Sequence, residues 1–217
     1  MSKQALYDFD GTITSKDTTI LLLIELLKLR PWRFSRLIWF LFRMIVSSDI
    51  KSKQGFKNKA IGCLIKGLSD RDLSGALKDF RNKVKFLYRP LILTSIDKTI
   101  QDGCTVLIVT ASPSFAISEC MSDLQVIILG TEFEKEGNIY TGLLKSKNCY
   151  GQEKVNRINE WATSNNITLS VQSAWSDHFS DFDMLSLSAK RYWVGGEKFQ
   201  KLIMNRDPEA NFVYAEQ

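Results

Sequence analysis

Five residues near the N-terminus, Asp8-Phe9-Asp10-Gly11-Thr12, combine two carboxylates with a glycine that permits a sharp turn. Residues two apart on a strand share a face, so Asp8 and Asp10 can reach one small space beyond a strand tip if the chain bends at Gly11. Carboxylates this close repel each other unless a cation lies between them, and divalent hard ions prefer such ligands. One carboxylate can then act as nucleophile and the other as general acid/base. The alternative is an acidic strand-to-loop turn without chemistry.

Three further positions carry the chemistry of a phosphate site. Thr110 follows the apolar run 106–109, so its hydroxyl lies at a strand tip beside a helix start and can hold a phosphoryl oxygen. Lys154 opens an expected helix, where a cation offsets the charge of a phosphate and of an attacking carboxylate. Asp177 ends a strand and Asp181 follows at the spacing of one helical turn. Each has a structural alternative when taken alone, a helix N-cap for the threonine and a surface position for the lysine.

The elements that must position these residues are strands alternating with helices. Such alternation predicts a parallel α/β sheet, a Rossmann-like core with helices on both faces. The expected strands are 4–9, 105–109, 125–129, 169–175 and 191–194, with a hairpin over 131–144 and a helix over 153–163. The sheet is expected to place the carboxyl ends of its strands, and the polar residues that follow them, along one edge.

Residues 17–88 interrupt this pattern with a helical segment that shows no period-two strand. Pro31 is expected to separate one helix from the next, and Ser69 to cap a helix that follows it. Because this segment comes after the first strand, we expect it to form an all-helical cap inserted into a core domain made of residues 1–16 and 89–217.

The order Asp-x-Asp-Gly-Thr, then Thr after an apolar strand, then Lys, then Asp-x-x-x-Asp resembles the four motifs of the haloacid dehalogenase (HAD) superfamily. The position of the helical segment is similar to that of the C1 cap in this superfamily. The runs 148–154 and 110–113 resemble those of subfamily IB, which contains phosphoserine phosphatase. The resemblance covers about residues 4–195.

This resemblance implies a Mg²⁺-dependent phosphatase. Asp8 would be the nucleophile that forms an aspartyl-phosphate, and Asp10 the acid/base. Thr110 would bind the phosphate and Lys154 would stabilise its charge. The Mg²⁺ ion would be held by Asp8, the backbone carbonyl of Asp10, and Asp177.

The resemblance also implies residues around these five. It places substrate contacts at Gly11, Asp17, Ala111 and Ser112, and supporting residues beside the metal at Ser180 and Asp181.

Two positions depart from the family pattern. The fourth motif usually has Gly before its first Asp and a small residue after it, whereas Ser176 and His178 flank Asp177 here. We expect His178 to be a supporting or surface residue rather than a substrate contact. Asp17 stands where phosphoserine phosphatases carry a Glu that recognises the substrate amine. The shorter acid argues against phosphoserine as the substrate.

The charge of the chain is concentrated in the expected cap. The total is +5, but residues 26–66 hold ten Lys and Arg against one acid, so this stretch is +9 and the remainder −4. On a helical wheel, Arg33, Arg36 and Arg43 gather on one side. The opposite arc holds Phe34, Leu37, Leu41, Met44 and Ile45, with Trp32 and Trp39 at the boundary. This arrangement suits the interface of an anionic membrane, and the alternative is an apolar arc packed inside the cap.

Other features bound the function. Four scattered cysteines and one histidine argue against a disulfide scaffold or a multi-histidine metal site. No uncharged run approaches the ~18 residues of a membrane span, and the N-terminus does not resemble a signal peptide. We therefore expect a cytoplasmic protein, with peripheral contact at the inner face of the cytoplasmic membrane as a further expectation. No nucleic-acid-binding motif accompanies the basic stretch, so no nucleic-acid partner is expected.

The layout resembles the HAD-type phosphatidylglycerophosphate phosphatases of Gram-negative bacteria, which implies a lipid phosphate as substrate. Two alternatives stay open: a phosphatase of a small soluble phosphomonoester such as phosphoserine, and a non-catalytic membrane-surface binding protein that retains the fold.

Overall fold

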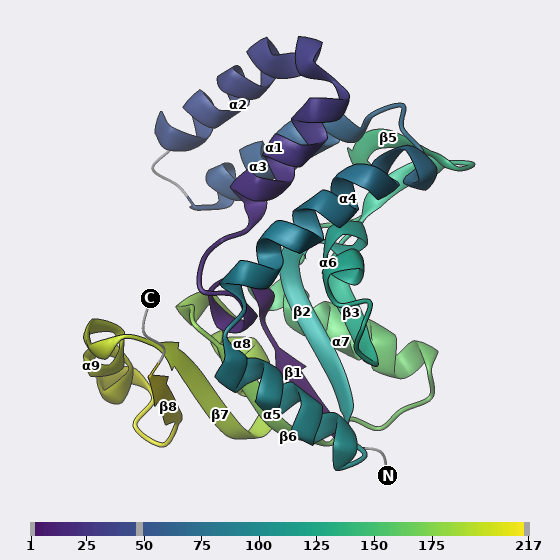
Figure 1. Ribbon diagram of the computed structural model, residues 1–217. Coiled ribbons are helices and arrows are strands. Elements are labelled where there is room, and N and C mark those ends of the chain that lie inside the picture. The colour runs from purple at the N-terminus through teal and green to yellow at the C-terminus, as the bar shows by residue number, and fades with distance from the viewer. Residues whose placement is uncertain (1–2, 47–49, 215–217) are drawn as a thin grey trace.

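The computed structural model describes residues 3–46 and 50–214, and its centre is a sheet of six parallel strands (Figure 1). The strand order is β3-β2-β1-β6-β7-β8, with every neighbouring pair parallel. The bounds are β1 (Gln4–Tyr7), β2 (Thr105–Pro113), β3 (Val126–Thr131), β6 (Val171–Ser176), β7 (Ser188–Gly195) and β8 (Asn211–Tyr214). The parallel α/β sheet predicted from the alternation of strands and helices is confirmed.

Helices bury both faces of this sheet. On one face α5 (Pro90–Gln101) and α6 (Ser114–Cys120) share a buried cluster with Ala5 and Tyr7 of β1. On the other, α7 (Gln152–Ser164), α8 (Phe182–Leu185) and α9 (Glu197–Arg206) share a cluster with Leu6. Successive residues of a strand point to opposite faces, and all four residues of β1 are buried because both of its faces are covered.

The structure differs from the sequence prediction at both ends of the chain. Strand β1 ends at Tyr7 rather than at residue 9, because Phe9–Ile13 form a tight turn in which Gly11 has φ +85°. Beyond the last predicted strand, α9 and β8 extend the fold, and β8 pairs with β7 as the sixth strand of the sheet.

Four helices of the expected cap lie together at one end of the molecule, beyond the carboxyl ends of the strands (Figure 1). They are α1 (Thr19–Leu29), α2 (Phe34–Val46), α3 (Ile50–Ile65) and α4 (Asp70–Val84). A short helical turn that starts at Pro31 separates α1 from α2, as predicted. The predicted N-cap of α4 is also confirmed, since the Ser69 hydroxyl accepts the Asp72 N–H and the Asp72 carboxylate accepts the Ser69 N–H.

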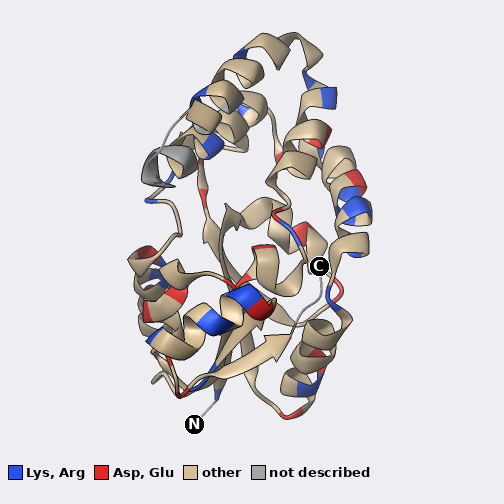
Figure 2. Ribbon diagram, turned by 90° about the vertical axis from the view of Figure 1, so that its left-hand side faces the viewer, with Lys and Arg blue, Asp and Glu red and all other residues tan. Residues whose placement is uncertain are grey.

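Helix α2 exposes most of its described apolar side chains. Leu37 is buried, but Phe34 and Ile45 of the predicted apolar arc are exposed, whereas the side chains of Leu41 and Met44 lie outside the described part of the chain. We call the following exposed residues the α2 surface: Trp32, Phe34, Arg36, Ile38, Trp39, Phe42, Arg43, Ile45 and Val46. Figure 2 shows Lys and Arg residues on the helices at this end of the molecule.

The predicted hairpin forms from β4 (Phe133–Glu136) and β5 (Ile139–Leu144), and it connects the core to the cap. Its contact with α3 is made by backbone: a Cβ atom at Gly62 would lie 2.0 Å from the carbonyl oxygen of Gly142. Only glycine at position 62 allows so close an approach. The cap therefore rests on the hairpin as well as on its two connections to the core.

Candidate active site

The acidic turn that follows β1 is held against the end of β6. The Asp8 N–H donates to the Trp175 carbonyl at 2.9 Å, which continues the pairing of the two strands. Gly11 lets the turn pass directly over Asp177, because a Cβ atom at this position would lie 2.0 Å from Asp177 Oδ2. The positive φ of Gly11 and this contact together require glycine. The first and fourth sequence motifs are thus brought to the same edge of the sheet.

Lys154 forms the centre of a buried charge cluster. Its Nζ donates to Asp8 Oδ1 at 2.6 Å and to Asp181 Oδ2 at 2.7 Å. The Ser176 hydroxyl also donates to Asp181 Oδ2, at 2.7 Å. Lys154 lies in the first turn of α7 and its side chain is almost inaccessible to solvent. A buried charge requires such partners, so the lysine and the two carboxylates hold one another in place.

The pKa values of the cluster show how crowded its charges are. Burial raises the pKa of Asp8 well above its usual range, and the nearby Asp181 and Asp177 carboxylates add to this effect, while Lys154 opposes it. Burial likewise raises the pKa of Asp177. Burial disfavours the charge of Lys154, but the Asp181 and Asp8 carboxylates outweigh it and raise the lysine pKa. The cluster therefore has more negative charge than Lys154 alone can offset.

This excess of carboxylate fits a Mg²⁺ ion. The Thr12 hydroxyl lies 3.1 Å from Asp177 Oδ1 and 3.5 Å from Asp8 Oδ2, so the two carboxylates face each other across it. Among the described residues no three His, Cys, Asp or Glu side chains form a complete metal cage. Mg²⁺ is commonly held by one or two carboxylates, with water and phosphate oxygens completing its shell. The oxygen donors of Asp8 and Asp177, with the Asp10 carbonyl expected beside them, suit such an ion.

Asp10 points its carboxylate toward the linker to the cap. Oδ1 accepts the Thr18 N–H and the Thr18 hydroxyl, both at 2.7 Å, and Oδ2 accepts the Ser112 hydroxyl. The Thr110 hydroxyl in turn accepts the Ser112 N–H at 3.0 Å. Ser112, expected to touch substrate, therefore orients Asp10, whereas Thr110 and Ala111 line the cavity. Nothing in the sequence motifs pointed to Thr18, because its position depends on how the cap linker folds back.

The cavity over these residues has a volume of about 370 Å³. Its lining includes the predicted residues Asp8, Asp10, Gly11, Asp17, Thr110, Ala111, Lys154, Asp177, Ser180 and Asp181. The cap contributes Gln54 and Lys57 of α3, which sequence reasoning did not single out from the other polar residues of this basic stretch.

Lys57 and Asp17 form a polar pair where the cap meets this cavity. Lys57 Nζ lies 3.3 Å from Asp17 Oδ2, and the lysine is 7% exposed. Although burial acts in the opposite direction, Lys57 and the Thr19 hydrogen bonds lower the pKa of Asp17. The side-chain amide oxygen of Gln54 is buried without a hydrogen-bond partner among the described residues. The cap side of the cavity thus offers a cation, an anion and an unpaired acceptor to whatever occupies it.

His178 organises the turn that leads to Asp181. Its Nδ1 accepts the Ser180 N–H at 3.1 Å and lies 2.9 Å from the Ser180 hydroxyl. The His178 N–H donates to the Ser176 hydroxyl. The side chain therefore caps the short helical turn Phe179–Asp181, and it also borders the cavity.

Comparison with known proteins identifies the family. Residues 5–186 match the model of haloacid dehalogenase-like hydrolases. No curated protein sequence matches the chain.

Solved structures share the fold at low sequence identity. A protein with unknown function from Bordetella pertussis Tohama I is 17% identical with a TM-score of 0.77, over 98% of this chain and 99% of that chain. A phosphoserine phosphatase in apo form is 15% identical with a TM-score of 0.62, over 100% and 94%. Cytosolic 5'-nucleotidase IIIB bound to cytidine is 12% identical with a TM-score of 0.61, over 99% and 80%.

Proposed function

We propose that this chain, which belongs to the haloacid dehalogenase-like hydrolase family, is a Mg²⁺-dependent phosphatase that attacks phosphomonoesters with Asp8. The observation that carries this proposal is the buried cluster in which Lys154 joins Asp8 to Asp181, at 2.6 and 2.7 Å. A nucleophilic carboxylate held by a buried cation, beside a second carboxylate at Asp177, suits the transfer of a dianionic phosphoryl group.

In the proposed reaction, an Asp8 carboxylate oxygen attacks phosphorus in line with the ester oxygen. The new O–P bond forms the aspartyl-phosphate while the bond to the leaving alcohol breaks, and Asp10 donates a proton to that alcohol. Asp10 then takes a proton from water, which attacks the same phosphorus and releases inorganic phosphate and the Asp8 carboxylate. Thr110 and Lys154 hold the phosphoryl oxygens through both steps.

Bound Mg²⁺ would neutralise charge on the phosphoryl group and orient it toward Asp8. Asp8, Asp177 and the backbone carbonyl of Asp10 are its proposed protein ligands. Asp181 and Ser180 support this arrangement, since Asp181 accepts from Lys154 at 2.7 Å and from the Ser180 hydroxyl at 3.3 Å.

The mechanism is tested by phosphate release from an aryl phosphate. We expect turnover with Mg²⁺, none after chelation, and a loss of at least about 10³-fold in Asp8→Asn, because the amide cannot act as the nucleophile. Asp183→Asn is a matched control, since this acid lies outside the cavity lining on the nearby helix α8. Activity that persists in Asp8→Asn would exclude the mechanism.

For the substrate, we propose a lipid phosphate such as phosphatidylglycerophosphate, on a protein that rests peripherally on an anionic membrane at the cytoplasmic face. The α2 surface supports this: it exposes Trp32 by 71%, Phe42 by 60% and Ile45 by 76%, with Arg36 and Arg43 beside them. Aromatic and aliphatic side chains flanked by arginine suit the interface of an anionic bilayer. None of the helices described here is long and apolar enough to cross a membrane.

A soluble phosphomonoester such as phosphoserine is the second candidate, and the cap side of the cavity favours it. The Lys57–Asp17 pair and the unpaired Gln54 oxygen offer charged and polar contacts to a small leaving group. A third candidate is a non-catalytic membrane-surface binding protein with this fold, which the aryl phosphate assay also tests.

Two assays separate the substrates. Co-sedimentation with anionic vesicles at low salt should capture the protein, and neutral vesicles should capture much less. A phosphatase screen that includes lipid phosphates in mixed micelles should then give a higher kcat/KM for the lipid phosphate than for phosphoserine. Failure to bind anionic vesicles, combined with preference for a soluble ester, would replace the first candidate with the second.

A further inference from the structure

A ladder of three aromatic rings crosses the sheet on the face that α5 partly covers. Tyr7, Trp175 and Tyr192 are cross-strand neighbours on β1, β6 and β7. The ring centroids of Tyr7 and Trp175 are 5.6 Å apart, and those of Trp175 and Tyr192 are 4.0 Å apart with nearly parallel planes. Tyr7 is fully buried, and its hydroxyl forms hydrogen bonds with the hydroxyls of Ser95 and Thr99 on α5. Tyr192, in contrast, is only half-buried. The ladder therefore starts in the core and ends near solvent.

A cavity of about 550 Å³ opens alongside the ladder, lined by Trp175 and Tyr192. Its other walls come from the start of β1, from α5 and from the first half of β6 and β7. The cavity thus lies toward the amino ends of the strands, whereas the proposed catalytic residues lie at their carboxyl ends. Its volume falls in the range of sites that bind small molecules.

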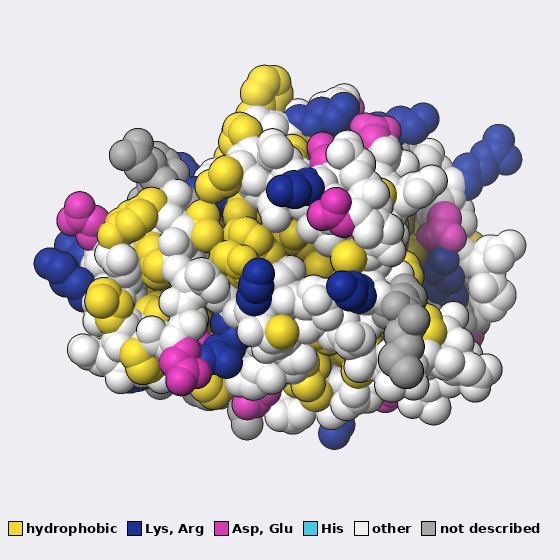
Figure 3. Space-filling model, turned by 90° about the horizontal axis from the view of Figure 1, so that it is seen from below, with side chains coloured by type: hydrophobic (Ala, Val, Ile, Leu, Met, Phe, Trp, Pro, Cys, Tyr) yellow, Lys and Arg dark blue, Asp and Glu magenta, His cyan; other side chains and the backbone are white. Residues whose placement is uncertain are grey.

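Three lysines surround this cavity with only one acid among its lining residues. Lys3, Lys98 and Lys190 are exposed, and Asp102 is the acid. None of these lysines forms an ion pair with another residue of the described chain. Figure 3 shows this side of the molecule, with a hydrophobic hollow near its centre and Lys or Arg side chains around it.

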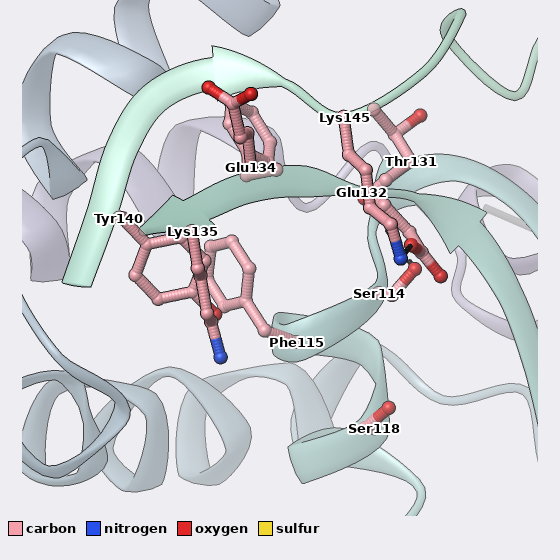
Figure 4. A pocket seen from close by; sticks show the side chains of 10 residues that line it. Ser114, Phe115, Ser118, Thr131, Glu132, Glu134, Lys135, Tyr140 and Lys145 are labelled. Carbon is pink, nitrogen blue, oxygen red and sulfur yellow. Dashed lines mark hydrogen bonds and ion pairs between the residues drawn. The ribbon is translucent and has the colours of Figure 1, made fainter. Parts of the chain in front are cut away.

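The cavity between α6 and the β4–β5 hairpin offers a contrast (Figure 4). It also has an aromatic wall, but its lysines are paired, Lys135 with Asp70 at 2.6 Å and Lys145 with Glu132 at 3.0 Å. Of these two cavities, only the one beside the aromatic ladder combines an aromatic wall with lysines that form no ion pair among the described residues.

We propose that this cavity, between α5 and the amino ends of β1, β6 and β7, binds a nucleoside phosphate. The planar base would lie across the edges of the Trp175 and Tyr192 rings that border the cavity, in the edge-to-face arrangement that the ring quadrupole favours. Lys98 and Lys190 would bind the phosphates as point charges. Ser173 and Gln172 of β6 also line the cavity.

The test is calorimetric titration of the full chain with ADP in EDTA, which prevents Mg²⁺-dependent turnover. We expect saturable binding by the wild type and a Kd about tenfold or more higher in Lys98→Gln/Lys190→Gln. Tyr192→Leu, which keeps an apolar side chain, should raise the Kd about fivefold through the lost contact between the ring and the base. Ribose 5-phosphate, which lacks the base, should bind more weakly than ADP by a similar factor.

Two controls separate this site from the catalytic cavity. Lys198→Gln/Lys201→Gln removes the same charge from α9, outside the cavity, and should leave the Kd for ADP unchanged. Asp8→Asn should also bind ADP as the wild type does. Each of four results would overturn the proposal. Two concern the variants: unchanged binding of ADP by Lys98→Gln/Lys190→Gln, or tighter binding of ADP in Asp8→Asn alone. The other two concern the ligands: ribose 5-phosphate binding as tightly as ADP, or no binding at millimolar ADP. Retained aryl phosphatase activity checks that the cavity variants are folded.

Discussion

Helices α2 and α4 belong to the same helical cap, but they use their apolar residues in opposite ways. Helix α4 buries Leu73, Leu77, Phe80 and Val84 against its neighbours and turns its charged residues outward. Helix α2 fully buries only Leu37 among its described side chains and leaves aromatic and aliphatic residues in contact with solvent.

The difference shows which sequence features the fold explains. The apolar positions of α4 follow the helical period because they fill the space between helices. The exposed residues of α2 fill no such space, and burying them would be favourable by roughly 25 cal/mol per Å². Contiguous exposed apolar residues of this kind mark a contact with something outside the chain. For α2, the flanking arginines make an anionic membrane the contact that we propose.

The largest expected effect is on stability, and it comes from α4. Phe80→Ala removes a fully buried aromatic ring and should lower the free energy of unfolding by about 3–5 kcal/mol, because a cavity replaces its contacts. The matched change on α2, Phe42→Ala, should alter it by less than about 0.5 kcal/mol, because that ring is 60% exposed. Denaturant unfolding of both variants measures the contrast. Equal losses would mean that α2 is packed in solution.

The next effect is on membrane binding. Phe42→Ser/Ile45→Ser removes two of the most exposed apolar side chains of the α2 surface. Affinity for anionic vesicles should fall by at least about 100-fold, because each of the two side chains contributes about 1.5–3 kcal/mol when it is buried. Hydrolysis of a soluble aryl phosphate should be unaffected. Vesicle binding as strong as that of the wild type would exclude the α2 surface as the contact.

A smaller effect should follow from charge alone. Arg36→Gln/Arg43→Gln should weaken binding to anionic vesicles by about fivefold per arginine and leave the weak binding to neutral vesicles unchanged. Raising the salt concentration should reduce the difference between the variant and the wild type, since salt screens exposed charges. A difference that is independent of salt would show that the arginines act through packing instead.

The smallest expected effect concerns the N-cap of α4. Ser69→Ala removes the hydroxyl that accepts the Asp72 N–H, and the free energy of unfolding should fall by about 1 kcal/mol. Ser74→Ala is the control, because its hydroxyl bonds only within the helix, to the Arg71 carbonyl. Equal changes in the free energy of unfolding of the two variants would show that the Ser69 N-cap has no special role.

The sequence motifs alone predict that three residues of the candidate site lie at one edge of the sheet. Asp8, Lys154 and Asp177 each follow a strand or open a helix, and parallel strands bring their carboxyl ends to one edge. Lys57 and Thr18 could not be predicted in the same way. Their positions depend on how α3 and the linker pack over that edge, and a basic helical stretch does not indicate which lysine turns inward.

The fold, like the candidate site, is only partly predictable from the sequence. The sheet follows from apolar runs that are buried on both faces, but α9 and β8 carry a weaker signal. Strand β8 has only four residues and lies at the edge of the sheet, where pairing with β7 rather than an apolar run determines its conformation. The end of β1 at Tyr7 depends on the turn at Gly11 and its contact with Asp177, which is a long-range interaction.

The hydrogen bonds of Asp10 connect three segments that are far apart in the sequence: the turn after β1, the end of β2, and the linker to α1. Two of these bonds come from Thr18, the residue that precedes α1. An outward movement of α1 would break both and release the Asp10 carboxylate from the position described here. If Asp10 is the acid/base that we propose, its readiness for proton transfer would depend on the position of the cap, and entry of substrate and exit of product would reset it.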